Sequence, residues 1–338
     1  MSSIASIRTR ATEGPYQGVI HAQVESVLRR ESSSGKPFFE LRLRDAGDSL
    51  VLRAWSESPA FAACGELDPG AGVEVEGEFY FNGAFGLDAR RWSLRRLNDV
   101  EEEALFAGSP GQVAATSLRM SELTAMLASV QDPRLRVLCE LFIRDFGSRF
   151  SRSAAARMNH HARKGGLLEH TLQMMRSASA ICGVYPALNR DLMLAGVLFH
   201  DSGKLWETCP PERGFGIPRE PIGELLGHIT TGIELVNGLW KQLPLDQWKS
   251  MQPASDEVRL HLLHLIASHH GSLEFGSPVE PKTPEAIALH YIDNLDARLE
   301  MFAEAFDANV EVAPRIFERS RPLGVYPVRP LPEWVSPG

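Results

Sequence analysis

The sequence predicts a multidomain protein with two fold classes, a small β-barrel followed by an all-α domain. Apolar and polar residues alternate through residues 16–98, as in strands with one buried face. Beyond residue 113 the apolar residues instead recur every three or four positions, as in amphipathic helices. With 338 residues, the chain is long enough for two domains with buried cores.

Alternating runs separated by turn signals define the first domain. The clearest runs carry Phe39, Leu41 and Leu43 on one side, and Val73 and Val75 on one side. Between the runs lie SSSGKP, DAGD, DPGAG and FNGAFG, which are rich in residues that favour turns. About five short strands fit a small closed barrel, for which an OB-fold is the best candidate.

The rest of the chain divides around a predicted linker. Residues 99–112, with an acidic run followed by AGSPG, are predicted to be this linker, and residues 1–15 an N-terminal extension. Residues 113–312 form the all-α domain, and 313–338 a Pro-rich tail. The last long helix is predicted to bury one apolar stripe in the core. Its members are Ile287, Tyr291, Leu295, Leu299, Phe302 and Phe306.

Composition narrows the function classes. No apolar run approaches 18 residues, so no membrane span is expected. The N-terminal residues MSSIASIRTRATEG contain no hydrophobic signal region, and the four cysteines form no CxxC pair, so we expect a cytoplasmic protein with free thiols. The net charge of −8 argues against a general polyanion binder, and any bound nucleic acid would need a local basic surface.

Metal-ligating residue types gather around the stretch LMLAGVLFHDSGKLWE at residues 192–207. A buried helix is predicted to end at His200 and Asp201, where Ser202 and Gly203 break it, so that both side chains can turn onto one ion. Further candidates follow at long intervals. They are His170, His228, His269, His270 and Asp293. Imidazole with carboxylate suits a first-row divalent metal, and this many ligands predicts two ions.

The order H…HD…H…HH…D, with HDxGK, resembles the HD-domain metal-dependent phosphohydrolases. The phrases GGLLEHT, HDSGK, GHI, SHHGSLEFGSPVEPKTPEA and HYIDNLDAR are similar to one branch, the YhaM-type 3′-to-5′ exoribonucleases. The resemblance is dense over residues 159–306 and looser in the N-terminal domain. It implies an HD helical bundle that shortens single-stranded RNA, or DNA, from the 3′ end and releases 5′-mononucleotides.

The ligand set and the resemblance together imply two-metal phosphodiester hydrolysis. One ion would be held by His170, His200, Asp201 and Asp293. The other would be held by Asp201, His228 and His269, with His270 as a further ligand. Lys204 would bind the scissile phosphate or steady the leaving oxygen. Manganese is the expected ion, with cobalt, iron, nickel and zinc as alternatives.

Substrate-binding candidates occur in both predicted domains. In the barrel, bases would stack on aromatic rings while arginines follow the phosphates, although each of these residues could equally belong to the barrel core or a solvated strand face. The barrel candidates are Phe38, Arg42, Arg44, Arg53, Trp55, Phe81 and Phe85. In the α domain, Lys282 and His161 are the candidates, and the alternative for His161 is to orient a ligand. His264 would also orient a ligand.

Several alternatives stay open at this point. Asp296 competes with Asp293 as a ligand, and the alternative for Asp296 is a salt bridge to Arg298 or to another basic residue. The protein could be another HD phosphohydrolase, such as a nucleotidase or a cyclic-nucleotide phosphodiesterase. It could also be a non-catalytic nucleic-acid-binding protein or a partner-binding scaffold. The sequence leaves open whether the protein forms a homo-oligomer.

Overall fold

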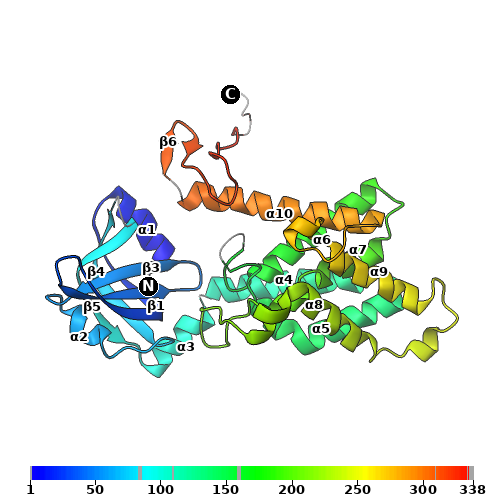
Figure 1. The fold of residues 1–338 in the computed structure, drawn as a ribbon, viewed down its shortest axis with the longest axis horizontal. Coiled ribbons are helices and arrows are strands. Elements are labelled where there is room, and N and C mark those ends of the chain that lie inside the picture. Colours follow the sequence, from blue (N-terminus) through cyan, green and yellow to red (C-terminus); the bar gives the residue numbers. More distant parts are fainter. Residues whose placement is uncertain are drawn as a thin grey trace. The chain divides into compact units, whose positions relative to one another are not determined.

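The computed structural model describes residues 2–82, 86–108, 110–157, 161–308, 310–332 and 334 (Figure 1). It contains two compact units. The β unit comprises Met1–Leu118 and Cys209–Pro218, and the helical unit comprises Arg119–Thr208 and Arg219–Gly338. The predicted fold class, a small β domain followed by an all-α domain, is confirmed.

The β unit is built on a five-stranded antiparallel sheet in the order β3-β2-β1-β4-β5. The strands are β1 (Tyr16–Glu31), β2 (Pro37–Arg44), β3 (Ser49–Trp55), β4 (Gly72–Asn82) and β5 (Gly86–Arg96). On β2, Leu41 and Leu43 face the core, whereas Arg42 between them is exposed, as the alternation predicted.

The prediction of a closed barrel is wrong in one respect, because the sheet is open. No ladder joins the edge strands β3 and β5 within the parts of the chain that the structure describes. Instead the short helix α2 (Ala60–Cys64), which connects β3 to β4, contacts both of these edge strands. The edge strands β3 and β5 also contact each other, but no hydrogen-bonded ladder joins them among the described residues.

Two segments that the sequence left irregular are helical. Residues 4–13 form α1 (Ile4–Glu13), which packs Ile7 and Ala11 into the core of the β unit. The predicted linker contains α3 (Asp99–Ala107) and the start of α4 (Pro110–Ala128). A capping box explains α3, because the Asn98 side chain accepts from the Glu101 backbone N–H while the Glu101 carboxylate accepts from the Asn98 backbone N–H.

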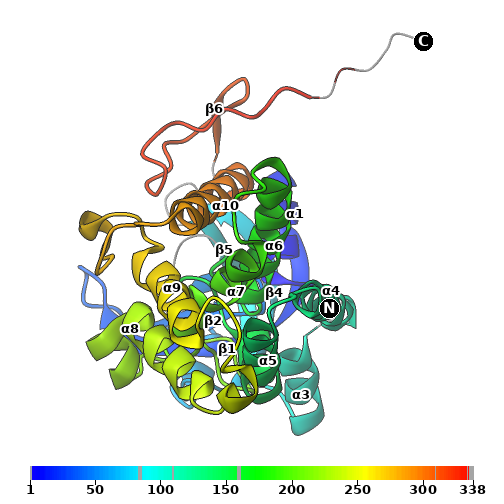
Figure 2. The same cartoon turned by 90° about the vertical axis from the view of Figure 1, so that its right-hand side faces the viewer.

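The helical unit is organised around one buried helix, α7 (Arg190–Phe199). Residues 192–199 of α7 are all buried, and the helix contacts α5, α6, α9 and α10 (Figure 2). The surrounding helices are α5 (Pro133–Arg152), α6 (Gly166–Val184), α8 (Pro221–Trp240), α9 (Ser255–Ser268) and α10 (Pro284–Ala308). Short 3-10 turns occur at η1 (Ser202–Leu205), η2 (Leu245–Trp248) and η3 (Leu273–Phe275), and a two-stranded β6-β7 ribbon (Glu311–Ala313 with Ile316–Phe317) follows α10.

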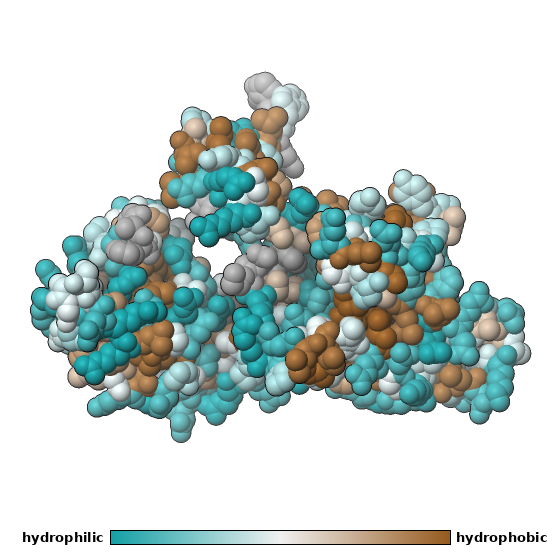
Figure 3. All heavy atoms as spheres, viewed as in Figure 1, coloured by the Kyte–Doolittle hydropathy of each residue, from teal (hydrophilic) through white to brown (hydrophobic). Residues whose placement is uncertain are grey.

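The apolar stripe predicted for α10 is present but does not pack in the core. Ile287, Tyr291, Leu295 and Leu299 are 45%, 67%, 53% and 60% exposed, and hydrophobic patches reach the surface of this unit in Figure 3. The helix instead buries Ala286, Leu289 and Ile292. Both faces of α10 are apolar, so periodicity alone could not identify the buried one.

Among the helices that the structure describes, none combines the length and the apolar composition that a membrane span requires.

Candidate metal centre

Helix α7 ends where the two adjacent candidate ligands begin. The backbone of His200 is still helical, whereas Asp201 has left the helix with φ −107° and ψ 12°, and η1 follows at Ser202. This change of direction lets two neighbouring side chains face the same space, as the sequence predicted from the Ser–Gly break. Both residues are buried, because α7 itself lies in the middle of the helical unit.

One half of the centre joins α6, α7 and α10. The Nε2 atoms of His170 and His200 are 3.3 Å apart, and the Asp201 Oδ2 atom lies 3.8 Å and 3.2 Å from them. From α10, Asp293 Oδ1 approaches the same nitrogens at 3.3 Å and 4.0 Å. Four predicted ligands, separated by more than a hundred residues of sequence, therefore converge on one small space.

The other half lies on the second oxygen of Asp201. Asp201 Oδ1 is 3.6 Å from His228 Nε2 on α8 and 3.7 Å from His269 Nε2 at the end of α9. The neighbouring His270 directs its Nε2 to within 3.3 Å of His228 Nε2. The Asp201 carboxylate thus has one oxygen in each half, which is the position expected of a bridging ligand.

Hydrogen bonds at the other ring nitrogen orient all five imidazoles. The Nδ1 atoms of His200, His269 and His270 lie 2.8 Å from the backbone carbonyl oxygens of Val197, Ile266 and Phe275. A carbonyl can only accept, so Nδ1 must carry the proton and Nε2 of the neutral ring keeps its lone pair. In His170 and His228, Nδ1 donates to a carboxylate oxygen instead. The His170 Nδ1 atom lies 2.7 Å from Asp296 Oδ2, and the His228 Nδ1 atom lies 3.0 Å from Glu207 Oε2.

The arrangement fits divalent cations. Two pairs of Nε2 atoms, His170 with His200 and His228 with His270, face each other at 3.3 Å with their Nδ1 protons already committed. Facing lone pairs repel unless a positive charge lies between them, and two nitrogens about 2.1 Å from one ion lie at about this separation. The buried His269 Nε2 also has no hydrogen-bond partner among the described residues. Nitrogen and carboxylate oxygen are donors that suit first-row metals.

The charges of the centre are balanced by close contacts. Burial opposes ionisation of Asp201, but Lys204 and His200 outweigh it and hold the pKa of this carboxyl well below its usual range. Burial likewise opposes protonation of His170, but the hydrogen bonds to Asp293 and Asp296 raise its pKa to about 9. The carboxylates around His170 thus favour positive charge in this half of the centre.

Comparison with known proteins supports the same interpretation. The HD domain family matches residues 167–298, which include all seven predicted ligands. The chain is 30% identical over 289 residues to the 3′-5′ exoribonuclease YhaM of Geobacillus sp. (strain WCH70), covering 85% of this chain and 84% of that protein. It is 31% identical to the protein of the same name from Bacillus subtilis (strain 168), covering 84% and 86%. This chain belongs to the YhaM family.

Two carboxylates beside the ligands of this YhaM-family protein had roles that the sequence did not assign. Asp296 makes no salt bridge to Arg298; its Oδ2 atom instead lies 2.7 Å from His170 Nδ1 and 3.1 Å from His161 Nε2. Burial would raise its pKa, but the two histidines lower it to about 2. Glu207, which orients His228, was not singled out, although it ends the same conspicuous stretch as Asp201.

Replacing Asp296 with asparagine is expected to weaken metal binding by about 10- to 100-fold, because an amide holds the His170 ring less firmly and makes it a poorer donor. Manganese affinity would be measured by titration calorimetry on the metal-stripped protein. Asp307→Asn, at an exposed position of the same helix, serves as the matched control. Equal affinities for the two variants would show that Asp296 does not act through His170.

The remaining candidates of the helical unit lie at different places. Lys204 donates from Nζ to Asp201 Oδ2 at 2.6 Å and therefore lies at the centre. His161 is fully buried against Asp296, one contact removed from His170, which favours an orienting role over direct contact with substrate. His264 accepts from the Lys282 backbone N–H instead of contacting a ligand, and the side chain of Lys282 is exposed. His160 lies outside the described residues.

Five β-unit candidates, Phe38, Arg42, Arg44, Arg53 and Trp55, share one face of β2 and β3, whereas Phe81 on β4 lies on the same side as the buried Phe79. Phe38 on β2 pairs in register with Trp55 on β3, and their rings are 4.7 Å apart. Trp55 and Arg42 are exposed, whereas Phe38 is nearly buried and Arg44 lies 3.7 Å from the carboxylate of Glu25. Phe85 lies outside the described residues.

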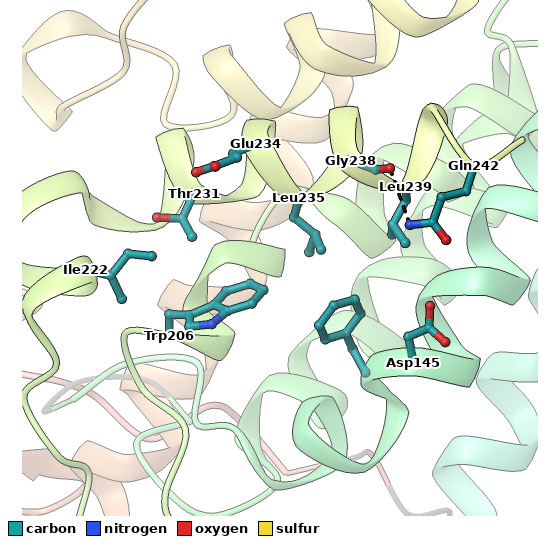
Figure 4. A pocket seen from close by; sticks show the side chains of 10 residues that line it. Asp145, Trp206, Ile222, Thr231, Glu234, Leu235, Gly238, Leu239 and Gln242 are labelled. Carbon is teal, nitrogen blue, oxygen red and sulfur yellow. Dashed lines mark hydrogen bonds between the residues drawn. The ribbon is translucent and has the colours of Figure 1, made fainter.

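A separate pocket of about 380 Å³ lies beside η1, between α5 and α8 (Figure 4). Trp206, Leu235 and Asp145 are among the side chains that line it. None of the predicted ligands belongs to its lining. Trp206 is nevertheless the neighbour of Glu207, so one wall of this pocket is formed by the segment that orients His228.

Proposed function

We propose that this protein is a metal-dependent 3′-to-5′ exoribonuclease that hydrolyses single-stranded RNA at a two-metal site and releases 5′-mononucleotides. The proposal rests on one arrangement of atoms. Two pairs of histidine Nε2 atoms face each other, and each pair has one of the two carboxylate oxygens of Asp201 beside it. The names of the relatives, which are 3′-5′ exoribonucleases, supply the substrate and the polarity.

The proposed ligand sets follow the two halves of the centre. His170, His200, Asp201 and Asp293 would hold one ion. Asp201, His228, His269 and His270 would hold the other. Bound there, a pair of divalent cations, with manganese as the proposed metal, would supply a nucleophile from water at neutral pH and would neutralise charge on the phosphate in the transition state. The orienting hydrogen bonds from Asp296, Glu207 and the backbone carbonyls would keep the ring nitrogens aimed before substrate arrives.

Lys204 would be the residue that contacts the phosphate. An ammonium group has three N–H donors, so Lys204 can retain its 2.6 Å bond to Asp201 and still donate to a phosphate oxygen. Its side chain is only partly buried, which leaves a route for the substrate to reach it. Its positive charge would also lower the energy of the developing negative charge on the leaving oxygen.

The exposed face of β2 and β3 would capture the single strand. Stacking on aromatic rings and contact with arginines are the usual means of binding single-stranded nucleic acid. Trp55 and Arg42 offer both on one face, and Phe38 packs against the ring of Trp55. The strand order and the position of α2 between β3 and β4 support an OB-like arrangement for this unit. A local surface of this kind is compatible with the net charge of −8.

A pair of labelled oligoribonucleotides tests the proposal. With manganese added, a 3′-end label is expected to appear in mononucleotide from the first turnovers, whereas a 5′-end label is expected to persist on a ladder of shortening products. Comparison of the hydrolysis rates of this RNA and of a DNA oligonucleotide with the same sequence measures the preference for RNA. Early release of the 5′ label would overturn the polarity, and turnover of free nucleotides without turnover of RNA would overturn the substrate class.

A further inference from the structure

We infer that the loop at residues 271–276 forms a platform on which the last bases of the RNA stack, with Phe275 as the principal contact. The inference rests on the proposed function and deepens it, because it names a substrate-binding residue at the same site. It follows from the side on which the metal centre opens, the rigidity of the loop and the apolar side chains that the loop exposes.

Within the described residues, solvent reaches some of the predicted ligands and not others. His170, His200 and His269 are at most 1% exposed, so no substrate can approach past them. The side chains of His228 and Asp293 are 14% and 19% exposed, and His270 is also partly exposed. A phosphodiester must therefore enter beside these three residues, and the segments next to them border its path.

The loop that follows His270 is fixed to the metal centre. The Phe275 carbonyl oxygen accepts from His270 Nδ1 at 2.8 Å, so the loop backbone lies only one imidazole ring away from a predicted ligand atom. Gly271 and Gly276, with φ of +83° and +84°, allow the tight turns at its two ends. Within the loop, the Phe275 N–H donates to the Ser272 carbonyl and the Gly276 N–H to the Leu273 carbonyl. The loop is therefore rigid enough to hold a side chain in a defined place.

This rigid loop exposes two large apolar side chains. Leu273 is 63% exposed and Phe275 is 66% exposed. Within the described parts of the chain, the Phe275 ring is not among those that pair with another aromatic ring or with a cation. Because the backbone of the loop is bonded to His270, one of the partly exposed predicted ligands, these two side chains offer apolar surface close to the path of the substrate.

The ligand that we infer for this surface is a base of the RNA, because the loop lies next to the metal centre. An exonuclease must place the terminal phosphodiester at the metals whatever the sequence, and stacking of a base on an aromatic ring tolerates every base. Phe275 has no polar atom on its side chain, so it can hold a base without selecting one. The 3′-terminal nucleotides would thus be held by their bases on the loop while their phosphate lies near Lys204 and Asp201.

The test is a Phe275→Ala variant assayed on two substrates. On ordinary single-stranded oligoribonucleotide, KM is expected to rise about 10-fold with kcat changed less than twofold, because stacking is lost equally from the ground and transition states. On an oligoribonucleotide whose last two residues lack bases, the same variant is expected to match the unmodified protein. Phe275→Trp is expected to keep the original KM on both substrates.

Tyr185→Ala is the matched control, because Tyr185 is similarly exposed but lies at the far end of α6 from His170. It is expected to leave KM unchanged. Suppose that the unmodified protein degrades RNA from the 3′ end. The stacking inference is then overturned, and the proposed function stands, if Phe275→Ala leaves KM unchanged or raises KM equally on the substrate that lacks terminal bases. If the unmodified protein releases no mononucleotides from RNA, both are overturned.

Discussion

Changing Asp201 to asparagine is expected to slow RNA hydrolysis by at least about 10³-fold. Asp201 is the only predicted ligand with an oxygen in each half of the centre, 3.2 Å from His200 and 3.6 Å from His228. An amide offers one weaker oxygen donor and no negative charge, so both ions would be held poorly. Metals supply several kcal/mol of transition-state stabilisation, and each 1.4 kcal/mol is about a factor of ten in rate.

Three measurements on Asp201→Asn would separate lost chemistry from lost structure. Turnover of labelled RNA gives the rate, elemental analysis gives the bound manganese per chain, and thermal unfolding shows whether the fold persists. Asp246→Asn, on the exposed turn η2, is the control and should behave as the unmodified protein. A folded Asp201→Asn protein that retains both ions and full turnover would exclude the bridging role.

Changing Gly203 to alanine is expected to destabilise the protein by about 3 kcal/mol or more and to abolish activity with it. A Cβ atom on Gly203 would lie 1.9 Å from the His228 carbonyl oxygen and 2.8 Å from the Gly232 nitrogen. Both neighbours are backbone atoms of α8, so no side-chain rotation can relieve the overlap. Helix α8 would have to move away from η1 and take His228 with it.

Urea unfolding followed by circular dichroism would measure this loss of stability. Gly238→Ala is the informative control, because it lies on the same α8 helix and a Cβ atom there meets nothing within 4 Å. That variant should be as stable as the unmodified protein or gain up to about 1 kcal/mol from the better helix propensity of alanine. If Gly203→Ala unfolded at the same urea concentration as Gly238→Ala, the close approach of η1 to α8 would be refuted.

The sequence predicted the parts of the site whose chemistry limits the choice of residue. The pair His200 and Asp201 would alone be weak evidence, because two adjacent residues recur by chance, whereas five ordered motifs with their flanking residues indicate one ligand set. The spacing of His170, His228 and Asp293 along the chain did not indicate how far apart they lie in space. The order of the motifs, which resembles that of the HD-domain phosphohydrolases, indicated that they belong to one site. The structure brings all seven predicted ligands together, within 4.0 Å of at least one other ligand atom.

The features that the sequence did not predict depend on which face of a helix packs against its neighbours. Asp296 could equally bind a metal, pair with Arg298 or orient His170, and only the rotation of α10 decides among these. The same rotation exposes Tyr291 and its neighbours, although a stripe of this kind normally packs inward. Helix α3 was obscured because its acidic run resembles a solvated linker, while its stability comes from the capping box of Asn98.

The course of the main chain limits how this protein can be divided. Cys209–Pro218 lies between Asp201 and His228 in sequence, yet it belongs to the β unit. There the Phe215 N–H donates to Gln23 Oε1 at 2.7 Å, and the Phe215 ring packs against Phe106. A fragment starting at Arg119 would carry this segment without the strand and helix that it contacts. Phe215 would then be exposed on the segment that connects Asp201 and His228, two of the predicted ligands. Removing residues 1–118 therefore takes away the partners of a segment that the helical unit still carries, and such a truncation is expected to be less stable than the whole chain.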